Sequence, residues 1–249
     1  MGEEILIRQA EAVCELRLNR PQKRNAITLA MYAALHAGLQ AAQRDPAVRV
    51  VLLSGEGAGF CAGNDLNDFL NGPGLSADHP VLGFLRTLAT YEKPLLAAVH
   101  GQAVGIGVTM LLHCDLVLAA RNAQLSMPFV NLGLVPEAAS SLLLPRLVGA
   151  KRAAELLLLG EVLDAAGAER LGLVNRVVAD GELEDAARAL AQRLARAPQG
   201  ALLATRRLLH GDPSELLVRI DEEARLFGAQ LKTEEFRAIV RAFLARKAQ

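Results

Sequence analysis

Residues 48–65 read VRVVLLSGEGAGFCAGND, and the order of apolar residues and glycines in this stretch indicates the fold class. Val48 to Leu53 is an apolar run, broken only by Arg49, which is typical of a strand buried on both faces. The Gly-rich segment Gly55 to Asp65 follows and leads to Leu66 to Leu70. A buried strand that continues through glycines towards a helix predicts a crossover between parallel strands.

A second junction of this kind lies further along the chain. Leu95 to Val99 is another apolar run, and Gly101 to Val108 (GQAVGIGV) connects it to a helical pattern from Val108 to Leu112. Leu116 to Leu118 predicts one more buried strand, and Val81 to Thr90 has helical spacing. Strands that alternate with helices predict an α/β fold with a largely parallel sheet.

The two ends of the chain have different patterns. Cys14 to Leu18 alternates apolar and polar residues and predicts a strand that pairs with Ile5 to Arg8 in a hairpin. From Glu182 onward the pattern is helical. We therefore expect an α/β core in residues 1–181 and a helical C-terminal subdomain in residues 182–249.

The composition excludes several classes of protein. Hydrophobic residues make up 52% of the 249 residues and charged residues 22%, which is too apolar for a disordered chain. The 27 basic and 27 acidic residues balance, so no net field attracts nucleic acid or an anionic membrane. Aromatic residues are only 4%, without any Trp, so few rings are available to stack on bases.

Cysteine usage and the apolar stretches bear on the compartment. Pro94 to Cys114 contains no charged residue, but a turn-forming His-Gly-Gln in its middle divides it into a buried strand and a buried helix rather than a membrane span. Cys14, Cys61 and Cys114 form no C-x-x-C pair and no zinc-like spacing. With no secretory signal pattern at the start, these features predict a reduced, cytoplasmic protein without a metal or a membrane segment.

The junctions at Gly55 to Asp65 and Gly101 to Val108 each allow two interpretations. Taken separately, the first could be an ordinary surface loop, and the second a place where a helix packs closely on a sheet. Taken together, both follow strands of a parallel sheet and open at the same carboxyl edge, where α/β proteins bind ligands. One backbone N–H from each could then point at the same oxygen and form an oxyanion hole.

Glu137 is a third feature, because it is the only acidic residue between Asp115 and Glu155. Its Leu, Val, Pro and Ala neighbours would desolvate the carboxylate and raise its pKa, which favours a role as proton acceptor. The alternative is a structural acid in the first turn of a helix. His113-Cys114-Asp115 resembles a triad on paper, but adjacent residues do not face one another, and we interpret these three as structural.

Four sequence blocks, in this order, resemble the crotonase superfamily, also called the enoyl-CoA hydratase/isomerase family. The resemblance covers nearly the whole chain and implies a ββα spiral core with a helical C-terminal region used for trimerisation. It also implies an acyl-CoA substrate, a homotrimer or dimer of trimers, and no cofactor beyond the coenzyme A of the substrate. The blocks are Leu18-Asn19-Arg20-Pro21 with Arg24-Asn25-Ala26, Phe60 to Leu66 (FCAGNDL), His100 to Gly107 (HGQAVGIG), and Gly133-Leu134-Val135-Pro136 before the helical tail.

The resemblance assigns roles to single residues. The backbone N–H groups of Asn64 and Ile106 would hold the thioester oxygen, at the two junctions described above. The Ala62 carbonyl would hold the adenine. The residues expected to line the groove for coenzyme A are Arg24, Ala26, Ala62, Gly63, Asp65, Leu66 and Gly105.

Two departures from the family pattern bear on the reaction. Family hydratases carry two glutamates, and this chain has Thr109 and Phe129 in their places. Glu137 stands where the Δ3,Δ2-enoyl-CoA isomerase branch has its single catalytic acid, which predicts an isomerase that shifts a C=C bond from the 3- to the 2-position. The alternatives are a hydratase or other crotonase reaction in which Asp65 or another acid takes part, and a catalytically silent acyl-CoA-binding protein. Zero net charge disfavours RNA binding, which occurs in one branch of the family.

Several apolar residues of the sequence bear on where the acyl tail of the substrate would lie. Four apolar residues either line a pocket for this tail or belong to the core: Leu70, Phe84, Leu88 and Phe129. Phe84 and Leu88 have i, i+4 spacing and share one face of a helix, which suits both interpretations. Asn71 to Pro80 is rich in Gly, Pro, Asn and Asp and could act as a lid over the tail.

Overall fold

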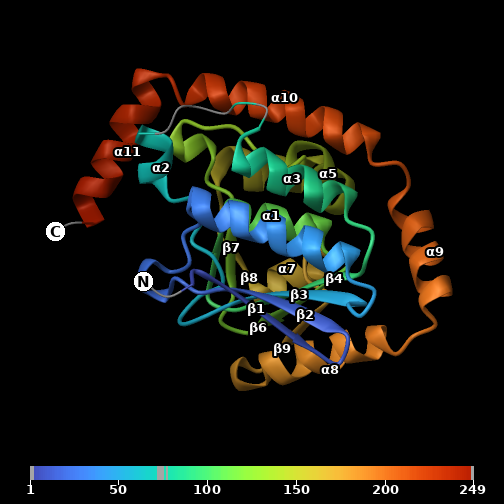
Figure 1. Cartoon of the computed structure of the whole chain (residues 1–249). Coiled ribbons are helices and arrows are strands. Elements are labelled where there is room, and N and C mark those ends of the chain that lie inside the picture. Colours follow the sequence, from blue (N-terminus) through green and yellow to red (C-terminus); the bar gives the residue numbers. More distant parts are fainter. Residues whose placement is uncertain (1–2, 72–75, 77, 248–249) are drawn as a thin grey trace.

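The computed structural model of this chain describes residues 3–71, 76 and 78–247, and Figure 1 shows how they are arranged. Within them, six strands form one sheet in the order β1-β2-β3-β4-β6-β9. β1 pairs antiparallel with β2, and the other neighbouring pairs are parallel. This is the mixed α/β fold that the sequence predicts. The strands are Ile5–Ala10, Val13–Leu18, Val50–Gly55, Leu95–Val99, Leu116–Ala120 and Arg176–Val178.

Helices cover both faces of this sheet. Alternate residues of a strand point to opposite faces, so each buried strand contributes side chains to a core on either side. One set of β3 side chains, Val51 and Leu53, faces a core shared with α1 (Leu29–Arg44) and α3 (Pro80–Thr90). The other set faces α8 (Leu183–Ala195). All six residues of β3 are buried, as the apolar run predicts.

The segments between the strands of the main sheet contain shorter elements. A three-stranded sheet, in the order β5-β7-β8, consists of Gln102–Val104, Gln124–Ser126 and Leu163–Asp164. The sequence analysis did not predict these strands, because two or three residues are too few to show a period of two. Other helices of the described residues are α2 (Leu66–Asn71), α4 (Ile106–Thr109), α5 (Ser140–Val148), α6 (Ala150–Ala154) and α7 (Ala165–Arg170).

The C-terminal region is helical, as predicted. After α8 the chain forms α9 (Gln199–His210), α10 (Ser214–Gln230) and α11 (Glu234–Lys247). Figure 1 shows α9 along the outside of the molecule, α10 across α3 and α5, and α11 beside α2. Because α8 shares the core of the sheet, the helical region begins with a helix that packs on the α/β part. The division at residue 181 stays a prediction.

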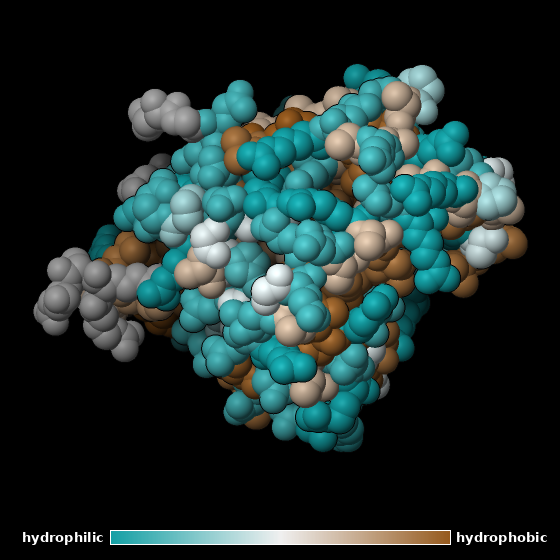
Figure 2. All heavy atoms as spheres, turned by 90° about the horizontal axis from the view of Figure 1, so that it is seen from below, coloured by the Kyte–Doolittle hydropathy of each residue, from teal (hydrophilic) through white to brown (hydrophobic). Residues whose placement is uncertain are grey.

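The surface mixes hydrophilic and apolar side chains. Figure 2 shows this mixture on the face seen from below. Leu208, Leu209 and Val218 are exposed apolar residues of the C-terminal helices. None of the helices that the structure describes has both the length and the apolar character needed to cross a membrane.

Candidate active site

The two Gly-rich junctions lie side by side. Cys61 of the first and Ala103 of the second form a parallel bridge, in which Cys61 N–H donates to Gln102 O at 3.0 Å. Val104 N–H donates back to Cys61 O at 2.8 Å. Gly107 permits this approach, because a Cβ there would lie 2.8 Å from the Cys61 carbonyl oxygen. The close packing considered for the second junction is therefore present, and it brings the two loops together.

Each junction presents a backbone N–H without a partner. Within the described part of the chain, neither the Asn64 N–H nor the Ile106 N–H donates a hydrogen bond. Gly63, with φ of 92°, and Gly105, with φ of 54°, turn the chain immediately before these groups. α4 begins at Ile106, two residues earlier than the sequence predicted, so its N–H is one of the free donors of a helix N-terminus. Free N–H groups of this kind are the donors that an oxyanion requires.

Glu137 lies in the turn that precedes α5, and no acidic residue occupies the first turn of that helix. The expectation that Glu137 is an acid of the first helical turn is therefore wrong, and its catalytic role stays a prediction. Ala138 and Ala139 have φ of 61° and 55°, a left-handed conformation that costs about 1–3 kcal/mol per non-glycine residue. The Glu137 side chain is buried, with 5% of the residue exposed. Burial raises the pKa of the Glu137 carboxyl to about 8. A hydrogen bond from Asn64 acts to lower this pKa, and the charge of Glu223 acts to raise it.

The Asn64 side chain joins the first junction to Glu137. The hydroxyl of Tyr32, on α1, donates to Asn64 Oδ1 at 2.5 Å. This contact directs the Nδ2 group the other way, where it lies 3.5 Å from each carboxylate oxygen of Glu137. The carboxylate and the residue that bears the first free N–H therefore belong to one hydrogen-bonded cluster.

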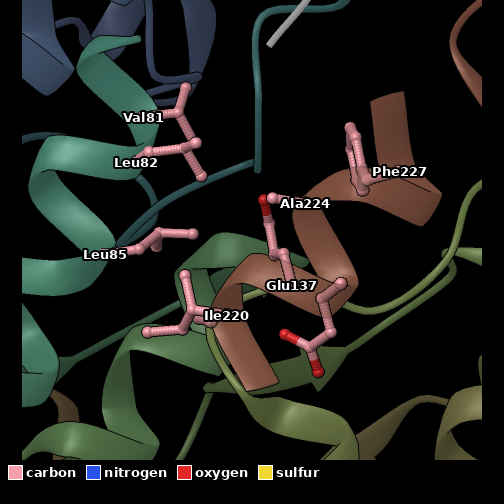
Figure 3. A pocket seen from close by; sticks show the side chains of 9 residues that line it. Val81, Leu82, Leu85, Glu137, Ile220, Ala224 and Phe227 are labelled. Carbon is pink, nitrogen blue, oxygen red and sulfur yellow. The ribbon is translucent and has the colours of Figure 1, made fainter. Parts of the chain in front are cut away.

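A small cavity lies against Glu137, between α3 and α10. Figure 3 shows apolar side chains of the two helices bordering it, from α3 on one side and from α10 on the other. Apart from two carboxyl groups its wall is apolar, and its volume of about 10 Å³ is close to that needed for one water molecule. The lining residues are Val81, Leu82, Leu85, Glu137, Ala138, Ile220, Glu223, Ala224 and Phe227.

The residues considered for the acyl tail lie elsewhere. Phe84, Leu88 and Phe129 are buried in the main core, where Leu88 also borders a second pocket of about 460 Å³ next to α9, and Leu70 packs against that core in a half-buried position. The helix α3 directs a different face to the cavity. The sequence did not separate these two faces, because α3 is apolar on both. Half of the segment from Asn71 to Pro80, considered as a lid, lies outside the described residues.

The residues expected to bind coenzyme A gather around the first junction. Ala62 N–H donates to Arg24 O at 2.9 Å, and Gly63 O accepts from Ile27 N–H at 2.8 Å. The Ala62 carbonyl accepts no hydrogen bond from any described residue, so it is available to a ligand. Gly105, at the second junction, donates its N–H to Ser126 O at 2.9 Å.

Asp65 and the residues beside it fix the shape of this loop. Arg20 Nη1 lies 2.7 Å from Asp65 Oδ2 and also donates to the carbonyl of Ala26 at 3.0 Å. Burial acts to raise the pKa of Asp65, but hydrogen bonds from Arg20 and Asn67 outweigh it and hold the pKa below its ordinary value. Leu66 is half-buried at the start of α2. An ion-paired carboxylate of low pKa is poorly suited to carry protons, which disfavours Asp65 as the catalytic acid.

Two sets of residues from the sequence analysis remain: Thr109 and Phe129, at the positions of the two absent glutamates, and the three residues that resemble a triad. Thr109 is fully buried, and its hydroxyl has no hydrogen-bond partner among the described residues. Asp115 pairs with Arg206 and His210, whereas the ring of His113 contacts the Ala138 carbonyl, so no triad forms. In the part of the chain that the structure describes, no group of three His, Cys, Asp or Glu side chains could hold a metal ion.

Glu223 is a residue that the sequence analysis missed. It lies on α10, is buried, and lines the same cavity as Glu137. Its oxygens accept hydrogen bonds from the N–H groups of Ala139 and Ser141. An acid placed among Leu, Arg and Glu on an amphipathic helix has the pattern of a solvated face, so its burial could not be read from spacing.

Comparison with known sequences identifies the class of protein that this fold and site define. Residues 8–249 match the family model described as enoyl-CoA hydratase/isomerase. The chain belongs to this family, the crotonase superfamily, and its fold is the one that the resemblance implied. An acyl-CoA substrate is consistent with that membership.

Individual relatives have different named activities. The 1,2-epoxyphenylacetyl-CoA isomerase of Escherichia coli is 38% identical, over 99% of this chain and 97% of that protein. Enoyl-CoA delta isomerase 2 of Rattus norvegicus is 33% identical, over 98% of this chain and 64% of that protein. Other relatives are named as probable hydratases. The crystal structure of an enoyl-CoA hydratase/isomerase from Pseudoalteromonas atlantica T6c superposes with a TM-score of 0.94 at 39% identity and covers 98% of both chains.

Proposed function

We propose that this enzyme is an acyl-CoA isomerase that shifts a C=C bond from the 3- to the 2-position of an enoyl-CoA, with Glu137 as its acid–base group. One observation carries the proposal: the buried carboxylate of Glu137 lies in a hydrogen-bonded cluster with Asn64, whose backbone N–H has no partner among the described residues. An isomerase needs one group that removes a proton and returns it nearby. Glu137 would be that group, and the free N–H groups of Asn64 and Ile106 support a role as oxyanion donors.

The proposed mechanism uses these groups in two steps. Glu137 removes a proton from C2 of the 3-enoyl thioester, and the negative charge of the dienolate moves to the thioester oxygen. The N–H groups of Asn64 and Ile106 stabilise that oxygen. The same carboxyl group then returns the proton to C4. A pKa of about 8 suits both steps, because a base and its conjugate acid are both accessible near neutral pH.

The residues of the site disfavour hydration. Addition of water requires one group that deprotonates water and another that protonates the α-carbon. Thr109 and Phe129 can do neither, and Asp65 is held in its ion pair with Arg20. A silent acyl-CoA-binding protein is disfavoured in turn, because the carboxyl of Glu137 is buried beside Asn64 rather than turned to solvent.

A second candidate reaction is the isomerisation of 1,2-epoxyphenylacetyl-CoA. The 38% identity to the Escherichia coli enzyme of that name, over almost the whole of both chains, favours it. Both candidates are isomerisations of a coenzyme A thioester, so they share the groove for coenzyme A and the oxyanion donors and differ in the acyl group.

Turnover of three substrates side by side tests the proposal. The purified protein is given a 3-enoyl-CoA, the matching 2-enoyl-CoA and 1,2-epoxyphenylacetyl-CoA, and the products are separated and weighed by mass spectrometry. We expect a product of unchanged mass from the 3-enoyl-CoA and no gain of water from the 2-enoyl-CoA. Hydration of the 2-enoyl-CoA without isomerisation would contradict the proposal, and exclusive turnover of the epoxide would favour the second candidate.

We further propose that the chain assembles as a trimer or a dimer of trimers. Support comes from Leu208 and Leu209 of α9 and Val218 of α10, which are between 68% and 86% exposed in one chain. Contact with another copy of the chain would remove these apolar side chains from water. Sedimentation at increasing protein concentration checks this, and a monomer at all concentrations would contradict it.

A reducing, cytoplasmic location is part of the same proposal. Cys14, Cys61 and Cys114 are all free of disulfide bonds. Proteins of oxidising compartments pair their cysteines more often than not. Fractionation of the source cells, with the protein followed by antibody, tests the location.

A further inference from the structure

The turn that carries Glu137 has a backbone conformation that needs support. Ala138 and Ala139 both lie in the left-handed region. Residues other than glycine adopt this region at a cost, and such turns persist where the surrounding groups hold them. The groups that hold this turn therefore also determine where the Glu137 carboxyl lies.

Glu223 of α10 binds the N–H groups at the beginning of α5. Its Oε2 accepts from Ala139 N–H at 2.6 Å, and its Oε1 accepts from Ser141 N–H at 3.0 Å. The Ser140 N–H between them donates to the Glu137 carbonyl at 3.1 Å. These N–H groups would otherwise be the unpaired donors of the helix N-terminus. A carboxylate that is 4% exposed and bound through both oxygens has a fixed position, and it fixes the turn.

His113 holds the turn from another side. Its Nε2 lies 2.8 Å from the Ala138 carbonyl oxygen. Burial lowers the pKa of His113 to about 4, so the ring is neutral at physiological pH and carries its proton on the nitrogen that faces the carbonyl. The peptide group between Ala138 and Ala139 is thus bound by His113 at its oxygen and by Glu223 at its nitrogen, two side chains of distant elements.

We propose that Glu223 is a positioning residue, which holds the turn at residues 138–139 and thereby keeps the Glu137 carboxyl beside Asn64. The inference rests on the proposed function, in which Glu137 is the base. Glu223 lines the cavity but takes no proton from the substrate in this account. Its effect on the reaction passes through the backbone of the turn and through its charge.

The charges around Glu137 are few. Among the described residues, the titratable groups that act on it or feel its charge are Tyr32 from α1, Cys61 from the first junction and Glu223 from α10. Burial raises the pKa of Tyr32 and that of Cys61, so both are neutral at physiological pH. Burial raises the pKa of Glu223 above its ordinary value, whereas hydrogen bonds from Ser141 and Ala139 and the charge of Arg219, on the same helix, favour its ionised form. Removal of the Glu223 charge should therefore lower the pKa of Glu137.

Two substitutions separate the holding of the turn from the charge. Glu223→Gln keeps the length of the side chain but removes the charge and one of the two acceptors. Glu223→Asp keeps the charge but is too short to reach both N–H groups. We expect kcat for 3-enoyl-CoA to fall about tenfold in both variants, with KM retained, because a hydrogen bond to a charged group is lost in each. The acid-limb pKa of kcat/KM should fall by about one unit in the Gln variant and stay near the wild-type value in the Asp variant.

Glu215→Gln is the matched control. Glu215 also joins α10 to α5, through an ion pair of 2.7 Å with Arg146, but both side chains are more than half exposed. Exposed pairs contribute little, so this variant should keep the wild-type kcat, KM and pH profile.

A second measurement reads the pKa of Glu137 without turnover. The carboxyl ¹³C signal of Glu137 is followed by NMR against pH, with Glu137→Gln to assign the signal. Wild-type protein that does not isomerise 3-enoyl-CoA would contradict the proposed function, and this titration would still decide the role of Glu223. Folded Gln and Asp variants with wild-type kcat and an unchanged Glu137 titration would overturn the positioning role, even if their melting temperatures fall. Should the Gln variant not fold, loss of kcat with retained KM in the Asp variant supports the proposal, and a wild-type kcat there overturns it.

Discussion

The two parts of the candidate site are held in different ways. The Gly-rich junctions are fixed by backbone hydrogen bonds between neighbouring segments, such as the bridge between Cys61 and Ala103. The turn with Glu137 is fixed by side chains from elsewhere in the chain, among them Glu223, which lies 84 positions from Ala139. The proposed oxyanion donors are therefore a property of the backbone frame, whereas the position and pKa of Glu137, the proposed base, depend on tertiary packing.

This difference predicts how variants of the two parts should behave. Changes in the side chains of the junctions should matter little unless they move or remove a backbone N–H. Changes in side chains around the turn should alter the position or the pKa of the base while the oxyanion donors stay in place.

Glu137→Gln should have the largest effect. It preserves shape and polarity but removes the base, so isomerisation should fall by about 10²–10⁴-fold. Acyl-CoA binding, measured by calorimetry, should persist, because the groups around Ala62 are untouched. Glu155→Gln, an exposed carboxylate paired with Arg152, serves as control and should keep full activity. If Glu137→Gln isomerised the substrate at the wild-type rate, Glu137 would not be the base.

Ile106→Pro should have the next largest effect. It removes the N–H at the first position of α4, where a helix accepts proline, so kcat should fall by about 10²–10³-fold while the fold is retained. Ile106→Ala also loses side-chain volume but keeps the N–H, and it should retain most of the activity. Equal loss of kcat in both variants would mean that packing, and not the N–H, is what matters at this position.

The pH dependence of kcat/KM should be set by Glu137 in the turn before α5, and not by the Gly-rich junctions. Glu137 must be ionised to accept a proton, and its pKa is raised to about 8, so kcat/KM should fall about tenfold per unit as the pH drops below that value. Above the pKa, kcat/KM should level off. Steady-state rates between pH 5.5 and pH 9.5 check this, and a profile that is flat down to about pH 5 would mean an ordinary carboxylate.

Gly107→Ala should change stability more than it changes chemistry. The added Cβ would lie 2.8 Å from the Cys61 carbonyl oxygen, so backbone must shift, at a cost of about 1–3 kcal/mol in the free energy of unfolding. Gly83→Ala is the matched control, since its Cβ would meet the His36 ring at an ordinary 3.6 Å inside α3. The control should be stabilised by about 0.5–1 kcal/mol. Denaturant unfolding measures both, and equal stability of the two variants would contradict the close approach of the junctions.

The parts of the fold that the sequence predicted are those with local signals. The alternation from Cys14 to Leu18 predicted the second strand of the hairpin, and the apolar run from Val48 to Leu53 predicted the buried strand Val50–Gly55. The short strand Gln102–Val104 was not predicted, since it depends on its partner Gln124–Ser126 rather than on its own residues. Pairing across the fold leaves little trace in so few residues.

The site shows the same division. Glycines mark the two junctions, and the isolation of Glu137 among apolar residues marks a buried acid, so these could be found from the sequence. Glu223 could not, because it lies beside Glu222 on a helix with several charged residues, and burial of one of the two depends on how α10 crosses α5. The face of α3 that lines the cavity could not be chosen either, since both of its faces are apolar.

Exchange and isomerisation in heavy water test the central claim, that one carboxylate carries both proton transfers. A 3-enoyl-CoA is incubated in D₂O with wild-type protein or Glu137→Gln, and ¹H NMR follows loss of the C2 proton and formation of the 2-enoyl product together. We predict that the wild-type protein forms the 2-enoyl product and that both signals slow by the same factor in the variant. Exchange at C2 that continues in Glu137→Gln, or a wild-type protein that forms 3-hydroxyacyl-CoA in place of the isomer, would contradict the account.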